Sequence, residues 1–311
     1  MARYSLATYT IRIKDKVRDI YVPINNIQNG TDFLNVMDNY LSNRHMNMAH
    51  QQAQRKLLKI RNFTRQNRVF SGIIETGEYG YEAELLDVNS SRTTHRRSVS
   101  EAEMLPFYFL IFLTQNTDEG ILILQRFKQY GIRTIFGRDI NEYISSQFHS
   151  LELQINPLVP SRLINEYLNN GRILKLRFIR FSFPPDIADA YDTQYHVEEE
   201  GYTEYVISAK RRGSIPILGR ILEVLNGQRQ LNELIEIQSF EYDKVKVEVD
   251  LNGNKRTIDL SDMSKLRAYI DVSQSVRLGN DGHPLFESID EIAQGLLQDL
   301  WTQIRGNNNV Q

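Results

Sequence analysis

The apolar positions of the first seventy residues predict a strand followed by a helix. Residues 2–13 are rich in β-branched and aromatic side chains and alternate with a period of two, which is typical of a strand. Thr31 then offers a helix N-cap, and the apolar side chains after it recur at helical spacing. These helical positions are Phe33, Leu34, Met37, Tyr40 and Leu41. We expect a polar, basic continuation of this segment to about Arg68.

The following segment has the period of a strand. Gly72, Gly77 and Gly80 punctuate two short apolar runs between residues 69 and 88, which predicts an antiparallel meander. Residues 105–113 and 119–127 are two further apolar runs that flank a polar turn, so they predict a hairpin. Because both faces of these runs are apolar, we expect the hairpin at the centre of a sheet that is covered on each side.

The second half of the chain predicts another set of strands and helices. With 311 residues, the chain is longer than a single core usually supports, and the aperiodic, proline-containing stretch 155–161 is the expected boundary. Strands are predicted at 172–183 and 203–210, a hairpin at 243–260, and an amphipathic helix at 289–304. The expected fold is therefore α+β, with an N-terminal domain (1–155) and a C-terminal domain (156–311), each a largely antiparallel sheet with packed helices.

Composition narrows the function classes. The chain has no cysteine, which excludes disulfides, cysteine-ligated zinc and iron–sulfur clusters. The longest apolar run, 105–113, is shorter than a membrane-spanning helix needs, and the N-terminus lacks the pattern of a signal peptide. We expect a cytoplasmic protein without a cofactor and without membrane insertion. The 37 basic and 39 acidic residues give a net charge of −2, so attraction for nucleic acid requires a local patch.

Residues 44–50 offer one candidate catalytic pair. The segment RHMNMAH resembles the Arg-polar-x4-His pattern of HEPN-type ribonucleases. The resemblance implies metal-independent RNA cleavage, with His50 as general base or acid and Arg44 stabilising charge on the phosphate. On a continuous helix, however, six residues place two side chains about 120° apart. The other interpretation is a solvated helix face.

A basic run follows this pair and is the main candidate for binding DNA or RNA. Its six cations are Arg55, Lys56, Lys59, Arg61, Arg65 and Arg68. No acidic residue lies between His50 and Glu75, so the run is expected to attract phosphates by counterion release. We also expect replacement of all six by glutamate to remove binding and to leave the melting temperature nearly unchanged. The alternative is a solvated or ion-paired surface.

A second basic cluster consists of Lys210, Arg211 and Arg212. It follows the predicted strand 203–210 in the manner of a restriction-type nuclease motif, but Ser208 stands where that motif needs an acidic metal ligand. Two interpretations of these three residues stay open, secondary phosphate contacts and a solvated basic loop, and we predict no metal site.

Residues 70–88 and 102–136 look like a segment of uncharacterised bacterial proteins encoded among anti-phage defence genes. The resemblance implies a bacterial cytosol and a role in sensing phage or in executing a response. Together with the basic run, it leads us to expect a defence component that binds nucleic acid. A HEPN-like ribonuclease and a non-catalytic scaffold, acting as a homo-oligomer or with a protein partner, remain open alternatives.

Overall fold

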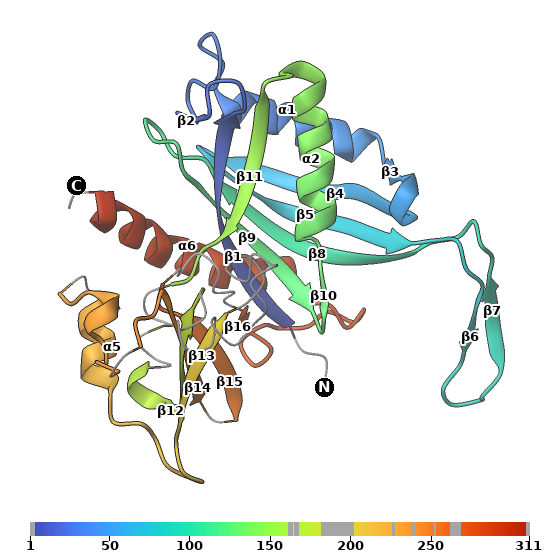
Figure 1. The fold of residues 1–311 in the computed structure, drawn as a ribbon. Coiled ribbons are helices and arrows are strands. Elements are labelled where there is room, and N and C mark those ends of the chain that lie inside the picture. The colour runs from blue at the N-terminus through green and yellow to red at the C-terminus, as the bar shows by residue number, and fades with distance from the viewer. Residues whose placement is uncertain are drawn as a thin grey trace, which may run out of the picture. The chain divides into compact units, whose positions relative to one another are not determined.

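The computed structural model describes residues 4–308 apart from 161–163, 165–167, 182–201, 226–227, 238–239, 252 and 262–268. Residue contacts divide the chain into two compact units (Figure 1). The first consists of residues 1–158 and 268–311, and the second of residues 159–267. Both combine helices with antiparallel strands, as the α+β prediction required.

The first unit is built on a ten-stranded sheet with the central order β11-β1-β9-β8-β5-β4-β3, to which β2, β10 and β16 are added. The strands are β1 (Tyr4–Asp15), β2 (Ile20–Val22), β3 (Ala49–Gln51), β4 (Lys56–Gln66), β5 (Val69–Glu78), β8 (Glu103–Phe112), β9 (Gly120–Phe127), β10 (Tyr130–Gly131), β11 (Leu151–Pro157) and β16 (Tyr269–Asp271). The predicted hairpin is confirmed as β8 and β9, which lie at the centre of this order.

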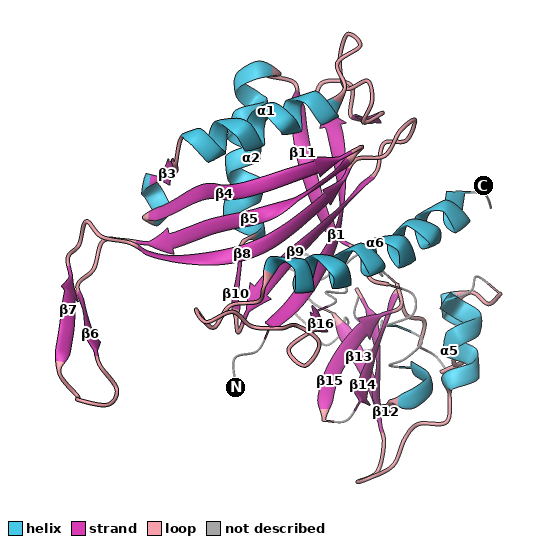
Figure 2. Ribbon diagram, turned by 180° about the vertical axis from the view of Figure 1, so that it is seen from behind, coloured by secondary structure: helices cyan, strands magenta, loops and turns pink. Residues whose placement is uncertain are grey.

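Helices cover both faces of the sheet, as Figures 1 and 2 show. One face carries α1 (Phe33–Met46) and α2 (Arg133–Gln147), whose apolar side chains form one core with Phe107 and Phe109. The other face carries α6 (Phe286–Asn308), which packs on Tyr108 and Leu110. Consecutive residues of β8 thus enter opposite cores, which explains the continuous apolar run.

The basic segment is a strand rather than a continuation of the helix. The N-cap of α1 is Asp32, whose Oδ1 accepts the Leu34 N–H at 2.9 Å, and not Thr31. The helix ends at Asn47, which is extended, and a short 3-10 helix (Gln52–Gln54) leads into β4. Leu58 and Ile60 are buried at alternate positions of β4, which is the period of a strand. The segment therefore forms a strand although it is highly charged.

The second unit contains a four-stranded sheet in the order β13-β12-β14-β15. Its elements are β12 (Arg172–Arg180), β13 (Thr203–Ser208), α5 (Leu218–Leu225), a 3-10 helix (Leu231–Glu233), β14 (Lys244–Leu251) and β15 (Asn254–Asp259). Phe178, Val247 and Ile221 belong to its separate core. The hairpin predicted at 243–260 corresponds to β14 and β15.

The C-terminal helix belongs to the first unit, which differs from the expected division into 1–155 and 156–311. After the second unit, β16 pairs with β1, and Ile289, Leu296 and Leu300 of α6 join the core that contains Tyr108. The second unit is thus inserted between β11 and β16. Residues 259–268 contain no proline or glycine, so the sequence does not mark the point where the chain passes from the second unit back to the first.

A small hairpin extends from the first unit between β5 and β8. Its strands are β6 (Ala83–Leu86) and β7 (Thr93–Arg97), which pair only with each other and stand away from the large sheet in Figures 1 and 2. In the part of the chain that the structure describes, no helix has the length and apolarity needed to cross a membrane.

Candidate nucleic-acid interface

Arg44 is bound to a buried carboxylate. It lies in the last turn of α1, and its Nε and Nη2 donate to Oδ2 and Oδ1 of Asp139 in α2 at 2.7 and 3.0 Å. Tyr40 donates its hydroxyl to the same Oδ2 at 2.8 Å, and the side chain of Asp139 is only 1% exposed. Burial and then the negative charge of Asp139 raise the pKa of Tyr40 well above its usual value. Arg44 therefore neutralises a buried charge between the two helices.

His50 lies on a different element from Arg44. It is exposed on β3, directly opposite Leu57 of β4, whereas Arg44 precedes the end of α1. The extended conformation of Asn47 separates the two elements, so the six-residue spacing is not carried on one helix. The candidate pair consequently consists of an arginine engaged with Asp139 and a histidine on the edge of the sheet.

Four of the six cations in the 55–68 segment have carboxylate partners. The N···O pairs are Lys56–Glu78 at 2.8 Å, Arg61–Glu75 at 2.7 Å, Arg65–Asp38 at 2.8 Å and Arg68–Asp32 at 2.7 Å. Arg55 donates Nη1 to the Gly80 carbonyl at 3.1 Å. The partners come from α1, its N-cap and β5, so the sequence segment contains no acid while its surroundings do. Replacing all six cations by glutamate would break these pairs and place like charges together.

The side chains of β4 divide between the two faces of the sheet. Leu58, Ile60 and Phe63 belong to the core of α1 and α2. Asn62 and Gln66 lie opposite Ile73 and Val69, two residues that pack in the core of α6. Because directly opposed residues share a face, Asn62 and Gln66 belong to the α6 face.

Thr64 and Lys59 extend this row along β4. Their partners on β5 are Ser71 and Glu75, which lie two residues from Ile73 and therefore on the same face. We call Lys59, Asn62, Thr64 and Gln66 the β4 strip. Its last three side chains are exposed, and Lys59 makes no ion pair with any residue that the structure describes. Glu75, the opposed carboxylate, is bound by Arg61.

A groove of about 430 Å³ lies where the β4 strip reaches α6. Its polar lining consists of Gln66, Asn67, Arg68, Gln115, Gln294 and Arg305. Trp301 supplies an aromatic ring, which meets Phe112 edge-on at 5.0 Å between ring centroids. The Arg305 guanidinium lies 4.7 Å from the Trp301 ring centroid. We call this feature the Trp301 groove; its lining contains no carboxylate among the residues described.

Reasoning from the sequence missed the Trp301 groove. Trp301 and Arg305 fall within the terminal amphipathic helix, where an apolar ring and a basic side chain one turn apart are ordinary. The sequence feature that could have pointed to this groove is the single tryptophan of the chain, Trp301, with an arginine four residues later on the same helix face.

Lys210, Arg211 and Arg212 lie in the second unit. They follow β13 in an exposed turn, closed by a hydrogen bond from the Gly213 N–H to the Lys210 carbonyl at 2.8 Å. Arg212 has φ of +64°. Within the described chain, none of the three has a carboxylate partner, and no group of three or more histidines or acids is arranged to hold a metal ion.

No model of a protein family matches the chain, and no curated protein sequence matches it.

Proposed function

We propose that the protein binds single-stranded nucleic acid on the α6 face of the large sheet, along the β4 strip and into the Trp301 groove. The observation that carries the proposal is the lining of this groove, which has no carboxylate among the described residues. It consists of four side-chain amides, a tryptophan ring, Arg305 and Arg68, of which Arg68 is paired with Asp32. Such a lining suits an unstacked base beside a phosphate.

The Trp301 ring favours a single strand over a duplex. A base must leave its stack before its face can lie on an aromatic side chain, and single strands expose bases without that cost. The amides of Gln66, Gln115 and Gln294 present both donors and acceptors, which can pair with base edges. Arg305 has no carboxylate partner in the described chain and supplies a positive charge beside the ring.

The β4 strip extends this site along the strand. From Lys59 to Gln66 it spans about 20 Å at the usual rise of a strand. Gln66 belongs to both features, so the strip and the groove are continuous. Lys59 would hold a phosphate at one end and Arg305 at the other, with polar side chains between them.

The salt dependence of binding distinguishes this site from an interface made of all six cations. Two phosphate contacts on a single strand correspond to a slope of log K against log salt of about −1.4, whereas six correspond to about −4. We propose the shallow slope, because four of the six sequence cations are already bound to carboxylates.

Fluorescence anisotropy with labelled oligo-U and oligo-dT, measured across a salt series, tests this function. Lys59→Gln is expected to lower affinity and to reduce the slope by about 0.7. Lys16→Gln is the matched control, since Lys16 is an exposed lysine that lines neither cavity and lies outside the β4 strip. A slope near −4, or equal losses in both variants, would contradict the site.

The resemblance to proteins of bacterial anti-phage defence supports a cellular role for this binding. We propose that the chain recognises single-stranded nucleic acid as part of such a defence in the bacterial cytosol. Lys210, Arg211 and Arg212 are proposed secondary contacts from the second unit.

Self-association through the β6–β7 hairpin is a second candidate function. An isolated two-stranded hairpin is marginally stable in water, and Leu85, Leu86 and Val88 are 52, 55 and 91% exposed. Arg96 pairs with Glu84 within the hairpin at 2.9 Å, and His95 lies 3.4 Å from Glu101. Glu82 and Asp87 beside β6 and Arg92 beside β7 make no ion pair with the residues that the structure describes. This charge segregation is self-complementary, so we propose a second copy of the chain as the occupant.

A further inference from the structure

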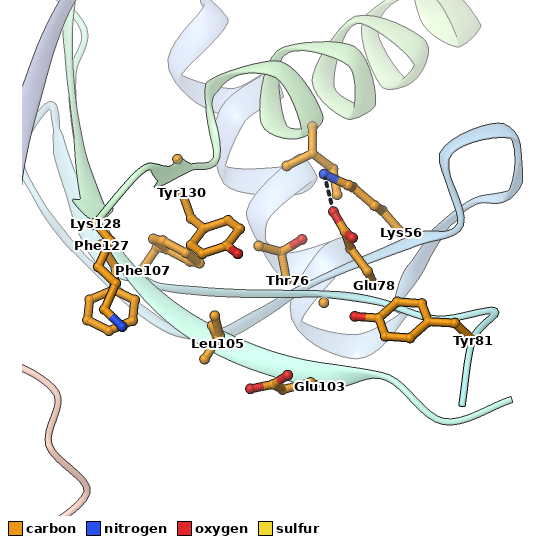
Figure 3. Close-up of a pocket in the computed structure, with 13 residues that line it drawn as sticks. Lys56, Thr76, Glu78, Tyr81, Glu103, Leu105, Phe107, Phe127, Lys128 and Tyr130 are labelled. Atoms are coloured by element: carbon orange, nitrogen blue, oxygen red, sulfur yellow. Dashed lines mark ion pairs between the residues drawn. The ribbon is translucent and has the colours of Figure 1, made fainter. Parts of the chain in front are cut away.

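A second cavity lies on the opposite face of the large sheet from the Trp301 groove. Its volume is about 290 Å³, and it is bounded by the ends of β5 and β8, the β9–β10 turn and the start of α2 (Figure 3). Phe107 in its wall belongs to the core of α1 and α2, whereas Phe112 and Trp301 belong to the core of α6. The two cavities are therefore separate sites.

The walls of this cavity suit a flat ring. Leu105, Phe107 and Phe127 provide apolar surface on one side. Tyr130 and Tyr81 approach from opposite sides with their hydroxyls directed toward the space between them, as Figure 3 shows. Arg97 supports Tyr81: its guanidinium carbon lies 4.0 Å from the ring centroid, and Nη2 donates to the Tyr81 carbonyl at 3.2 Å.

One carboxylate in the cavity wall has no cation bound to it. Lys56 and Glu78 neutralise each other at 2.8 Å, and the dashed line in Figure 3 marks this pair. Glu103 forms no ion pair with the residues that the structure describes, and Lys128 lies over the Phe127 ring with Nζ 5.2 Å from its centroid. An ionised carboxylate only accepts hydrogen bonds, so Glu103 selects a ligand with donors.

We propose that this cavity binds a guanine base, with the ring against Leu105 and Phe107 and the Watson–Crick edge facing Glu103. Guanine carries a ring N–H and an amino group side by side, and these two parallel donors match the two oxygens of a carboxylate. The hydroxyls of Tyr81, Tyr130 and Thr76 are available to the remaining polar edge. A volume near 300 Å³ is the lower range of ligand sites and suits a single nucleoside.

Isothermal titration of the full chain with guanosine, inosine and uridine tests this site. Guanosine is expected to bind, inosine to bind at least about 10-fold more weakly because it lacks the amino group, and uridine not to bind. Glu103→Gln is expected to reduce guanosine affinity by at least about 10-fold. Glu101→Gln is the matched control, because Glu101 is a nearby exposed acid outside the cavity.

Three results would overturn the proposal: no guanosine binding, equal binding of guanosine and inosine, or unchanged guanosine affinity in a folded Glu103→Gln variant. Trp301→Ala should leave guanosine binding intact, which separates this site from the single-strand site. The tetranucleotide UUGU is titrated in the same series with Trp301→Ala. Tighter binding of the tetranucleotide assigns the cavity to a base within a strand, and equal or weaker binding assigns it to the free nucleoside; both retain the guanine site.

Discussion

Arg44 donates two hydrogen bonds to the buried carboxylate of Asp139, from Nε at 2.7 Å and from Nη2 at 3.0 Å. Removing one partner of a buried ion pair leaves an uncompensated charge, which typically costs about 3–5 kcal/mol. We therefore predict that Arg44→Ala lowers the free energy of unfolding by this amount in urea titrations. His50→Ala, on the exposed edge, should change it by less than about 0.5 kcal/mol.

These two variants also test the ribonuclease alternative. RNA cleavage that survives EDTA and disappears in a stable His50→Ala variant would support it. An Arg44→Ala variant as stable as the wild type would contradict the structural role that we assign to Arg44.

Asp32 gives the fold a pH dependence in acid. Burial by itself would raise the pKa of Asp32, but hydrogen bonds from Arg68 and from the Leu34 N–H hold it below its ordinary value. A lowered folded-state pKa contributes stability that is fully present above the unfolded pKa, about 3.9, and is lost as the pH falls through the lower, folded value.

Asp32→Asn isolates this charge, since asparagine still caps a helix. We predict a loss of about 1–2 kcal/mol at pH 7 from the hydrogen bonds to charged Arg68, and a smaller difference from wild type at pH 3. Urea unfolding of both proteins at pH 7, 5 and 3 measures this difference in the free energy of unfolding. A difference that grows on acidification would contradict this assignment.

Gly72 is required by the close approach of neighbouring strands. A Cβ at this position would overlap the Asn62 carbonyl oxygen and lie 2.8 Å from the Phe63 Cα, and these backbone atoms could move only by distorting β4. We predict that Gly72→Ala costs at least about 2 kcal/mol in thermal or urea unfolding. Gly295→Ala in α6 meets nothing within 4 Å and should stabilise by about 0.5–1 kcal/mol. Equal effects would contradict the packing described.

The β6–β7 hairpin predicts a concentration-dependent mass. Light scattering should give about twice the 36.3 kDa of one chain at high concentration, because the exposed leucines are covered by a second copy. The double substitution Leu85→Ser and Leu86→Ser should return the mass to one chain without lowering the melting temperature of the main sheet. A wild type that stays monomeric at all concentrations would reject this interface.

Much of the fold could be predicted from the sequence, and the reasons are local. Residues 105–113 are apolar at every position, which only a strand covered on both faces or a buried helix accommodates, and the polar turn at 114–118 decides for a hairpin. The apolar side chains from Phe33 to Leu41 show helical spacing because one face of α1 is buried in the core. The return of α6 to the first unit depends on packing across more than one hundred residues and leaves no local pattern.

The candidate site could be predicted only in part, because charge counted along the chain differs from charge counted in space. The acids that neutralise Lys56, Arg61, Arg65 and Arg68 come from residues 32, 38, 75 and 78. Lys59 is the member of the run to which we still assign a phosphate, because it lies on the α6 face and makes no ion pair in the described chain. The Trp301 groove joins segments 66–69, 112–115 and 294–305, which no sequence window contains.

The fluorescence of Trp301 tests the central proposal most directly, because the chain has no other tryptophan and the signal reports on this groove alone. Oligo-U or oligo-dT is titrated at low salt while tryptophan emission and anisotropy of the labelled oligonucleotide are recorded together. We predict saturable quenching that follows the anisotropy, and a loss of affinity of about 5- to 150-fold in Trp301→Ala from the loss of base stacking. Anisotropy that rises without any change in tryptophan emission, or no binding at all, would contradict single-strand recognition at the Trp301 groove.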